Sequence, residues 1–424
     1  MARRRGAALL SAMALCTVLA GCTTADPPAR PPASAAASSE PAETRLPGGV
    51  RHERLTRRLD SGEPVRLSVL RVSPDARASV AAVHGAAMTR AETVRALARA
   101  SGALLAVNGT YFDVGTGRDA SPYDGDPIGL YAEDGRVLSE AQAGRPALLL
   151  GGGDGRLTAR IAEVSTTGRL RAADGARREL DGVNRVAGRI PGCGGVGGDR
   201  LTSDGRSMAQ PSRGVCADAD EVVYFTPQWG HRTPPGPADS AEVLLAADGT
   251  VLRTRTPAGG PLPADGRSLY GIGAGAAWLE AHARPGTRPA VSVRMTDPGG
   301  QPLTGTVRSA LGASARLLRD GKADPDAARL GTEREPRTVA CVTADGSLLL
   351  IAIDGRAPGT SVGATPAEAA RLARSLGAVD AVNLDGGGST TVVVGGRAVN
   401  SPRGTENGAV TERRVANAIV VLPE

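Results

Sequence analysis

The sequence is poor in aromatic residues, with two tryptophans, five tyrosines and two phenylalanines among 424 residues. A core with so few large rings must be filled mainly by valine, leucine, isoleucine and alanine. Histidine is also scarce, at four residues that lie far apart in the sequence. Zinc ligands occur at short, recurring spacings, so this distribution argues against a zinc enzyme.

Beyond the three arginines at the N-terminus, long runs of charge of one sign are absent as well. The formal net charge is +6, and half of this surplus comes from Arg3, Arg4 and Arg5 at the N-terminus. The other lysines and arginines are scattered and are not interleaved with aromatic residues. This pattern argues against nucleic-acid binding.

Long apolar runs are rare, and the clearest one, Ala7 to Ala20, follows the three N-terminal arginines. It is too short to span a bilayer and has the flanks of a signal peptide, assigned to residues 1–21. Small residues precede Cys22, which resembles a bacterial lipobox, and Cys22 would carry the lipid. The alternative is an ordinary signal peptide, which would give a secreted protein. The lipobox interpretation predicts an exported lipoprotein anchored to the outer face of the cell membrane.

Beyond Cys22 the composition changes twice. Residues 22–48 are rich in proline, alanine and serine and are predicted to form a disordered linker. Residues 49–424 are long for one domain but contain no second linker of this kind. The glycine- and proline-rich stretch from about 150 to 300 is predicted to be a β-rich, loop-rich insertion in that domain.

Three cysteines remain in the region after the linker. Cys193 and Cys216 have glycine-rich, loop-like surroundings, and a disulfide between them is plausible in an exported protein. Cys341 lies in an apolar run and is predicted to be a buried free thiol.

The regular elements predict an α+β (mixed α/β) fold, with a central mixed β-sheet and flanking helices. One helix is expected over residues 89–100, capped by Thr89. A second begins at Thr365, which forms a capping box with Glu368. Apolar strands are expected at 348–353 and 379–385, on either side of this second helix. If the helix is a crossover, these two strands pair in parallel.

Asp385 stands out because of its surroundings. The chain contains twelve Asp-Gly pairs, most of which are expected to be turns. Asp354 and Asp385 differ because each ends an apolar strand. The strand period places Asn383 and Asp385 on one face. The glycines 386–388 that follow allow backbone N–H groups to approach an anion, so this segment is predicted to form a polar or phosphate-binding site.

The aromatic residues gather in two windows, residues 111–131 and 224–229. Two interpretations stay open for them. The rings either pack in the core or stack against sugar rings.

Several segments together resemble the phosphodiester glycosidase family, bacterial relatives of the lysosomal enzyme that uncovers mannose 6-phosphate. They occur in the family's order and are Asn108 to Phe112, Pro336 to Thr338, Ile353 to Arg356, Gly363 to Thr365 with Glu368, Asn383 to Thr390, Val399 to Pro402, and Glu412 to Ala418. The resemblance is dense over 336–422 and thin between 150 and 300. Thr110 and the segment 339–341 depart from the family's usual residues.

The resemblance implies hydrolysis of the anomeric C–O bond of a sugar-1-phosphodiester, with release of sugar and phosphomonoester. Carboxylates suit the oxocarbenium-like transition state, and the candidates are Asp385, Asp354 and, more weakly, Glu412. Arginine forks and backbone N–H groups suit the phosphate. The candidate substrate and phosphate ligands are Arg337, Thr338, Asn108, Asn383, Gly386, Gly387, Gly388, Ser389, Arg356 and Asn417.

No cofactor is required by these residues, although their carboxylates could hold a divalent cation such as Ca²⁺. The expected partner is a sugar-phosphate small molecule or an envelope polymer, and the lipid anchor is the only expected membrane contact. The alternative function is a non-catalytic lipoprotein that binds cell-wall glycans. A serine hydrolase using Ser361 is rejected, because Pro358 precedes its Gly-x-Ser-x-Gly motif and no histidine follows it.

Overall fold

The computed structural model describes residues 46–113, 125–142, 144–153, 155–191, 200–201 and 215–424. The chain divides into two units, Met1–Glu43 and Thr44–Glu424, and all described residues belong to the second. The predicted signal peptide, Cys22 and nearly all of the linker lie outside the described residues and stay predictions, as do the proposed domain limits. None of the described helices has the length and apolar character needed to cross a membrane.

The first sheet contains seven strands in the order β1-β2-β26-β25-β27-β23-β24, and all neighbours are antiparallel. Its strands are β1 (Val50–Arg58), β2 (Pro64–Val72), β23 (Ala315–Arg319), β24 (Lys322–Ala323), β25 (Arg337–Thr343), β26 (Leu348–Ile353) and β27 (Ala378–Asn383). Strands β25 and β26 are buried along their whole length. Strand β26 is apolar throughout and β25 is apolar over residues 339–342, because both faces of the sheet are covered.

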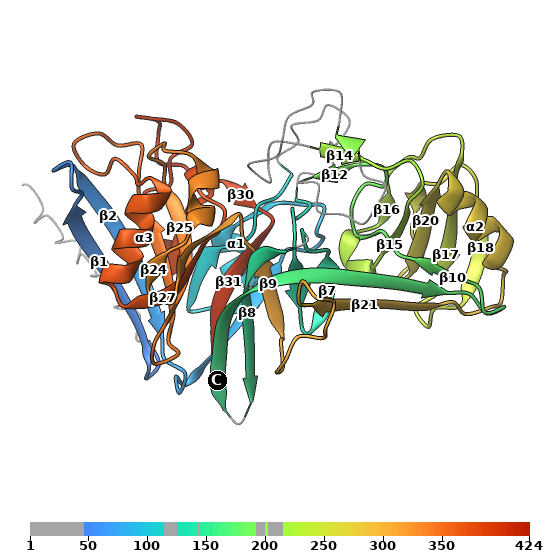
Figure 1. Ribbon diagram of the computed structural model, residues 1–424, viewed down its shortest axis with the longest axis horizontal. Helices are drawn as coiled ribbons and strands as arrows, with labels where there is room; N and C mark the ends of the chain where they lie inside the picture. Colours follow the sequence, from blue (N-terminus) through green and yellow to red (C-terminus); the bar gives the residue numbers. More distant parts are fainter. Residues whose placement is uncertain (1–45, 114–124, 143, 154, 192–199, 202–214) are drawn as a thin grey trace, which may run out of the picture. The chain divides into compact units, whose positions relative to one another are not determined.

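Helix α3 (Pro366–Ser375) covers one face of this sheet and packs on β23, β25 and β27 (Figure 1). The predicted capping box is confirmed. The Thr365 hydroxyl accepts from the Glu368 N–H at 3.1 Å, and the Glu368 carboxylate accepts from the Thr365 N–H at 2.9 Å. These bonds satisfy donors that the first helical turn leaves free, so the start of α3 is specified locally.

Two further sheets complete the centre of the unit. One has the order β29-β28-β5-β31-β3, and the other has the order β10-β9-β8-β22-β6-β7 with β21 also paired to β9. Their strands are β3 (Ala78–His84), β5 (Leu105–Asn108), β6 (Tyr131–Glu133), β7 (Arg136–Ser139), β8 (Arg145–Gly153), β9 (Arg156–Arg171), β10 (Arg177–Glu179), β21 (Ala290–Thr296), β22 (Ser309–Gly312), β28 (Val392–Val394), β29 (Arg397–Ala398) and β31 (Asn417–Pro423).

The shortest strands form small ribbons beside these sheets. They are β4 (Glu92–Thr93) with β30 (Arg414–Val415), β12 (Ile190–Pro191) and β13 (Arg200–Leu201) with β14 (Val215–Ala217), and β16 (Arg232–Thr233) with β19 (Gly260–Pro261). Three 3₁₀ turns, η1 (Pro227–Trp229), η2 (Pro325–Leu330) and η3 (Gly387–Ser389), complete the described elements. The last of these holds the glycines that follow Asp385.

A separate five-stranded sheet is built from the middle of the chain, in the order β11-β15-β20-β17-β18. It comprises β11 (Gly182–Val183), β15 (Val222–Phe225), β17 (Ser240–Leu245), β18 (Val251–Arg255) and β20 (Arg267–Ile272), with helix α2 (Ala274–His282) packed on it. Phe225 lies edge-on to Trp229 and Tyr270, with ring centroids 5.0 Å and 5.7 Å apart. These buried rings, and the buried Tyr131, form core, so sugar stacking is the wrong interpretation for them.

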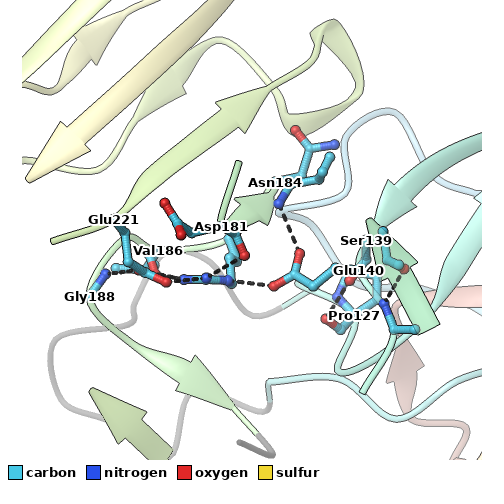
Figure 2. Close-up of polar contacts among 12 residues, drawn as sticks. Pro127, Ser139, Glu140, Asp181, Asn184, Val186, Gly188 and Glu221 are labelled. Atoms are coloured by element: carbon cyan, nitrogen blue, oxygen red, sulfur yellow. Dashed lines mark hydrogen bonds and ion pairs between the residues drawn. The ribbon is translucent and has the colours of Figure 1, made fainter. Parts of the chain in front are cut away.

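A buried ion-pair network ties this middle sheet to the segment after β7 (Figure 2). The Arg185 guanidinium donates to the Glu140 carboxylate at 2.5 Å and to both oxygens of Glu221. The Val183 N–H donates to Glu140, and the Gly188 N–H donates to Glu221. We call Arg185, Glu140 and Glu221 the Arg185 network, and it satisfies every carboxylate oxygen that it buries.

The predicted α+β fold class is wrong, because the described part of the chain is mostly antiparallel β-sheet. Its three α-helices have only eight, nine and ten residues. The only parallel ladder among the described strands joins β11 to β15. The predicted parallel pairing of 348–353 with 379–385 is also wrong: both strands pair with β25, which lies between them. Helix α3 is a crossover that skips one strand.

Helix α1 (Val94–Ser101) begins later than the predicted 89–100 helix, and its cap is Thr93. The Thr93 hydroxyl accepts from the Ala96 N–H at 3.1 Å, whereas the Thr89 hydroxyl donates to the Trp229 carbonyl. Residues 92–93 pair with β30 as strand β4. This pairing fixes extended backbone there, and the helix starts only after it.

Candidate active site

The segment after β27 forms a tight turn that contains three consecutive glycines. Gly387 has φ = +58°, a conformation that side chains disfavour. A Cβ added to Gly386 would lie 2.8 Å from the Pro336 carbonyl oxygen, and one added to Gly388 would lie 2.9 Å from an Arg413 guanidinium nitrogen. The Gly388 N–H donates to no protein acceptor among the described residues. The turn therefore presents a backbone donor and a guanidinium at one place.

Asp385 lies at the start of this turn, and one of its oxygens accepts from the Gly386 N–H at 2.9 Å. Burial raises the pKa of Asp385 to about 6, although the Ser389 hydroxyl, the Arg413 charge and the Gly386 N–H oppose this shift. No direct ion pair to Asp385 exists among the described residues. A carboxyl with this pKa changes charge near neutral pH, which suits general acid–base work.

Tyr111 and Asn383 are brought next to Asp385. The Asn383 side-chain amide donates to the Tyr111 oxygen at 2.9 Å and to the Ser314 oxygen at 3.1 Å. Burial and then the negative charge of Asp385 raise the pKa of Tyr111 to about 12, so its hydroxyl stays protonated. The side-chain amide oxygen (Oδ1) of Asn383 is buried and accepts no hydrogen bond from the described residues. Such an atom is costly unless a ligand or water bonds it.

Asn108, Thr338 and Asn417 are fully buried and hold the loops of the site. The Asn108 amide donates to the Asp385 carbonyl at 2.8 Å, and its oxygen accepts from the Thr338 hydroxyl at 2.8 Å. Asn417 bonds both the N–H and the hydroxyl of Thr110, at 2.9 Å and 2.7 Å. These three predicted ligand residues have their bonds inside the protein, where they position the residues around Asp385.

The two predicted arginines are also engaged within the protein. Arg337 donates to the Ala364 carbonyl at 2.6 Å and the Glu333 carbonyl at 2.9 Å. Arg356 pairs with Glu335 at 2.7 Å, and a Cβ on Gly387 would lie 3.2 Å from its guanidinium. Arg413 is the exposed cation that acts on Asp385. Sequence reasoning did not select it as a ligand, although it is part of the 412–418 motif.

Glu412 is not brought to Asp385 by any bond among the described residues. Its carboxylate accepts from the Arg95 guanidinium at 2.7 Å and from the Arg95 N–H at 2.8 Å. A carboxylate is favoured at the N-terminus of a helix such as α1. This placement gives Glu412 a structural role in fixing the chain beside the site.

Asp354 lines a different pocket, together with residues of β1, β2 and the segment 399–401, and Asp385 is not part of that lining. The Ser361 hydroxyl donates to the Asp354 carbonyl at 2.6 Å and accepts from the Arg66 N–H. Ser361 is buried in this structural role. Its environment agrees with the rejection of a serine nucleophile.

The remaining predicted sites give mixed outcomes. Cys341 is a buried free thiol, as predicted, and burial raises its pKa. Cys193 and the side chain of Cys216 lie outside the described residues, so their disulfide stays a prediction. Within the described ranges no three His, Cys, Asp or Glu side chains are grouped so that they could hold a metal ion. A Ca²⁺ site stays untested.

The family model for phosphodiester glycosidases matches residues 241–422, which include Asp354, Asp385 and Arg413. A solved Burkholderia pseudomallei protein, described as exported, shares 30% identity with a TM-score of 0.73, over 85% of this chain and 75% of its own. A solved Synechocystis protein shares 20% identity and the fold, with a TM-score of 0.63, over 89% of this chain and 62% of its own.

The catalytic domain of zebrafish N-acetylglucosamine-1-phosphodiester alpha-N-acetylglucosaminidase aligns with 14% identity and a TM-score of 0.41, over 91% of this chain and 85% of its own. No curated protein matches the sequence. The family match covers the whole turn after β27, and the Burkholderia relative aligns with most of the chain. The chain belongs to the phosphodiester glycosidase family.

Proposed function

We propose that this protein hydrolyses the anomeric C–O bond of a sugar-1-phosphodiester and that Asp385 is its catalytic carboxylate. The observation that carries the proposal is the Asp385 carboxyl, with a pKa of about 6, beside the Gly388 N–H and the Arg413 guanidinium. This combination suits a reaction that removes a proton at one atom and creates negative charge at another.

In this mechanism the Asp385 carboxylate takes a proton from a water molecule as the water oxygen attacks the anomeric carbon. The bond from that carbon to the phosphate oxygen breaks, and the oxygen keeps the electron pair. A phosphomonoester has a second pKa of about 6, so it leaves without a general acid. Arg413 and the Gly388 N–H stabilise its new charge. One carboxylate is therefore enough, and Asp354 is free for another role.

Tyr111 and Asn383 supply the neighbouring sugar contacts in this proposal. The Tyr111 hydroxyl stays protonated and can donate to Asp385 or to a sugar oxygen. The side-chain oxygen of Asn383, which accepts no bond from the described residues, can accept one from a sugar hydroxyl. Because the base must be ionised, kcat/KM should rise with pH through about 6.

The test is hydrolysis of a set of glycosyl-1-phosphodiesters in ¹⁸O-labelled water. Cleavage of the anomeric C–O bond places the label in the released sugar, whereas label in the phosphate would contradict the proposal. Asp385→Asn should lower kcat/KM at least about 10³-fold while the fold is retained, and Asp239→Asn, at an exposed position, is the control. Binding of cell-wall glycan without turnover by the wild-type protein would support the non-catalytic alternative.

Export and lipid attachment at Cys22 belong to the same proposal. They are supported by the N-terminal arginines, the residues before Cys22 and the exported Burkholderia relative. Labelling of the wild-type protein by a fatty-acid probe, lost in Cys22→Ala, is the expected result. An unlabelled wild-type protein in the culture medium would show that it is secreted instead.

A further inference from the structure

A polar pocket of about 310 Å³ lies beside the first two strands, β1 and β2, and the end of β26. We call it the arginine pocket, and its polar lining is Arg54, Thr56, Arg66, Ser68, Asp354, Asn400 and Ser401. Its volume is in the range of pockets that hold small organic ligands. The mechanism proposed above uses none of these residues.

Two exposed cations, Arg54 and Arg66, line this pocket. The register pairs Arg54 with Ser68 and Thr56 with Arg66, which puts both arginines on one face as diagonal neighbours. Neither guanidinium forms an ion pair or hydrogen bond among the described residues, and both are exposed. Like charges held this close are unfavourable in the free protein. An anion bound between the two guanidinium groups would offset that repulsion and accept hydrogen bonds from both.

Asp354 is fixed at the floor of the pocket and is only 8% exposed. One carboxyl oxygen accepts from the Asn400 amide at 3.0 Å and the Ser401 N–H at 3.1 Å, while the other has no bond within the described residues. His52 is held by Ser68 at 2.8 Å, and burial lowers the pKa of this histidine, so it adds no positive charge at neutral pH. A free carboxyl oxygen beside two arginines suits a ligand that carries both hydroxyl groups and an anion.

The arginine pocket is connected to the Asp385 turn through one residue. The Asn400 amide that bonds Asp354 also donates to the Thr390 carbonyl at 2.9 Å, and the Asn400 oxygen accepts from the Val392 N–H at 2.8 Å. Thr390 closes the glycine turn by donating its N–H to Gly387. The pocket and the proposed catalytic carboxylate therefore flank the same turn.

We propose that the arginine pocket binds a second sugar-phosphate unit of a polymeric substrate, so that the substrate is a phosphodiester-linked glycan. This inference rests on the proposed function. The phosphate lies between Arg54 and Arg66, and a sugar hydroxyl donates to Asp354. A small glycosyl phosphodiester fills the Asp385 site alone and leaves the arginine pocket empty.

The experiment measures binding to the Asp385→Asn protein by calorimetry. The probes are phosphodiester-linked oligomers of N-acetylglucosamine 1-phosphate with two to six repeats, a single-unit phosphodiester, and an uncharged glycan of equal length. Arg54→Ala/Arg66→Ala should weaken oligomer binding at least about tenfold and leave single-unit binding within about twofold. The control is Arg51→Ala/Arg57→Ala, which removes the same charge from the opposite face of β1.

Unchanged oligomer affinity in Arg54→Ala/Arg66→Ala, or an equal loss in the control, would overturn the inference. So would equal affinity for the uncharged glycan. Hydrolysis of the single-unit phosphodiester by the wild-type protein is measured separately, and its absence would count against the proposed function alone. In the active background, the same arginine substitutions should raise KM for the oligomer and leave kcat for the single unit unchanged.

Discussion

The Arg185 network and the Asp385 turn are two polar regions that differ in how their carboxylates are paired. In the network, every oxygen of Glu140 and Glu221 accepts a bond from Arg185 or a backbone N–H. At the turn, Asp385 has one backbone donor, no direct ion pair among the described residues and a raised pKa. A paired buried charge holds elements together, whereas an unpaired one is a cost that function can justify.

The largest expected effect is at the network. Glu221→Gln removes one of the two carboxylates that form ion pairs with the buried Arg185 among the described residues, and Glu221 accepts two of its bonds. We expect a loss of about 3–5 kcal/mol in the free energy of unfolding, measured by denaturant titration. The exposed pair Arg288–Asp248 is the control, and Asp248→Asn should leave stability nearly unchanged. If Glu221→Gln is as stable as the wild type, the Arg185 network does not stabilise the fold and the prediction is wrong.

At the Asp385 turn, the same change of carboxylate to amide should increase the free energy of unfolding at neutral pH instead of lowering it. The pKa of Asp385 is raised from 3.8 to about 6, so the folded state binds this proton more tightly than the unfolded state does. Stability is then lost as pH rises from about 4 through 6. Asp385→Asn should therefore be more stable than the wild type at pH 7.5, by about 1–3 kcal/mol.

The pH dependence separates this effect from changes in packing. Below about pH 4 both the wild-type carboxyl and the asparagine are neutral, so the difference in unfolding free energy should vanish there. Thermal or denaturant unfolding at pH 3.5 and 7.5 measures the difference in unfolding free energy between the wild type and Asp385→Asn. A difference that is equal at both pH values would mean that burial does not act on the Asp385 charge.

Local signals in the sequence were sufficient where neighbours in the chain decide the structure. The start of α3, the strand 348–353 and the glycine turn depend on capping, an apolar run and steric limits. The order of strands was not accessible, because β25 enters between β26 and β27 through pairing that no local pattern encodes. Thr93 replaced Thr89 as a cap for the same reason, since β4 pairs with a strand more than 300 residues away.

The sequence was sufficient to predict where the site lies in the chain, but it was less informative about the role of each residue. The strand period placed Asn383 and Asp385 on one strand face, but β27 ends at Asn383 and Asp385 belongs to the turn that follows. Residue type alone could not separate Asn108, whose side-chain nitrogen and oxygen both bond the protein, from Asn383, whose side-chain oxygen accepts no bond from the described residues. Arg337 and Glu412 were selected for their charges, but contacts with Ala364 and Arg95 engage them. These differences come from tertiary contacts.

The smallest expected effect is that of Tyr111→Phe. This substitution tests whether the Tyr111 hydroxyl acts in the reaction or only supports the structure of the Asp385 turn. The substitution removes one acceptor from the Asn383 amide, which keeps its bonds to Ser314 and to the Leu384 carbonyl. We expect the free energy of unfolding to change by about 1 kcal/mol or less. If the Tyr111 hydroxyl contacts the substrate or Asp385 during the reaction, kcat/KM should fall on the order of tenfold. If activity falls only in proportion to the amount of folded protein, Tyr111 has a structural role, as Glu221 does.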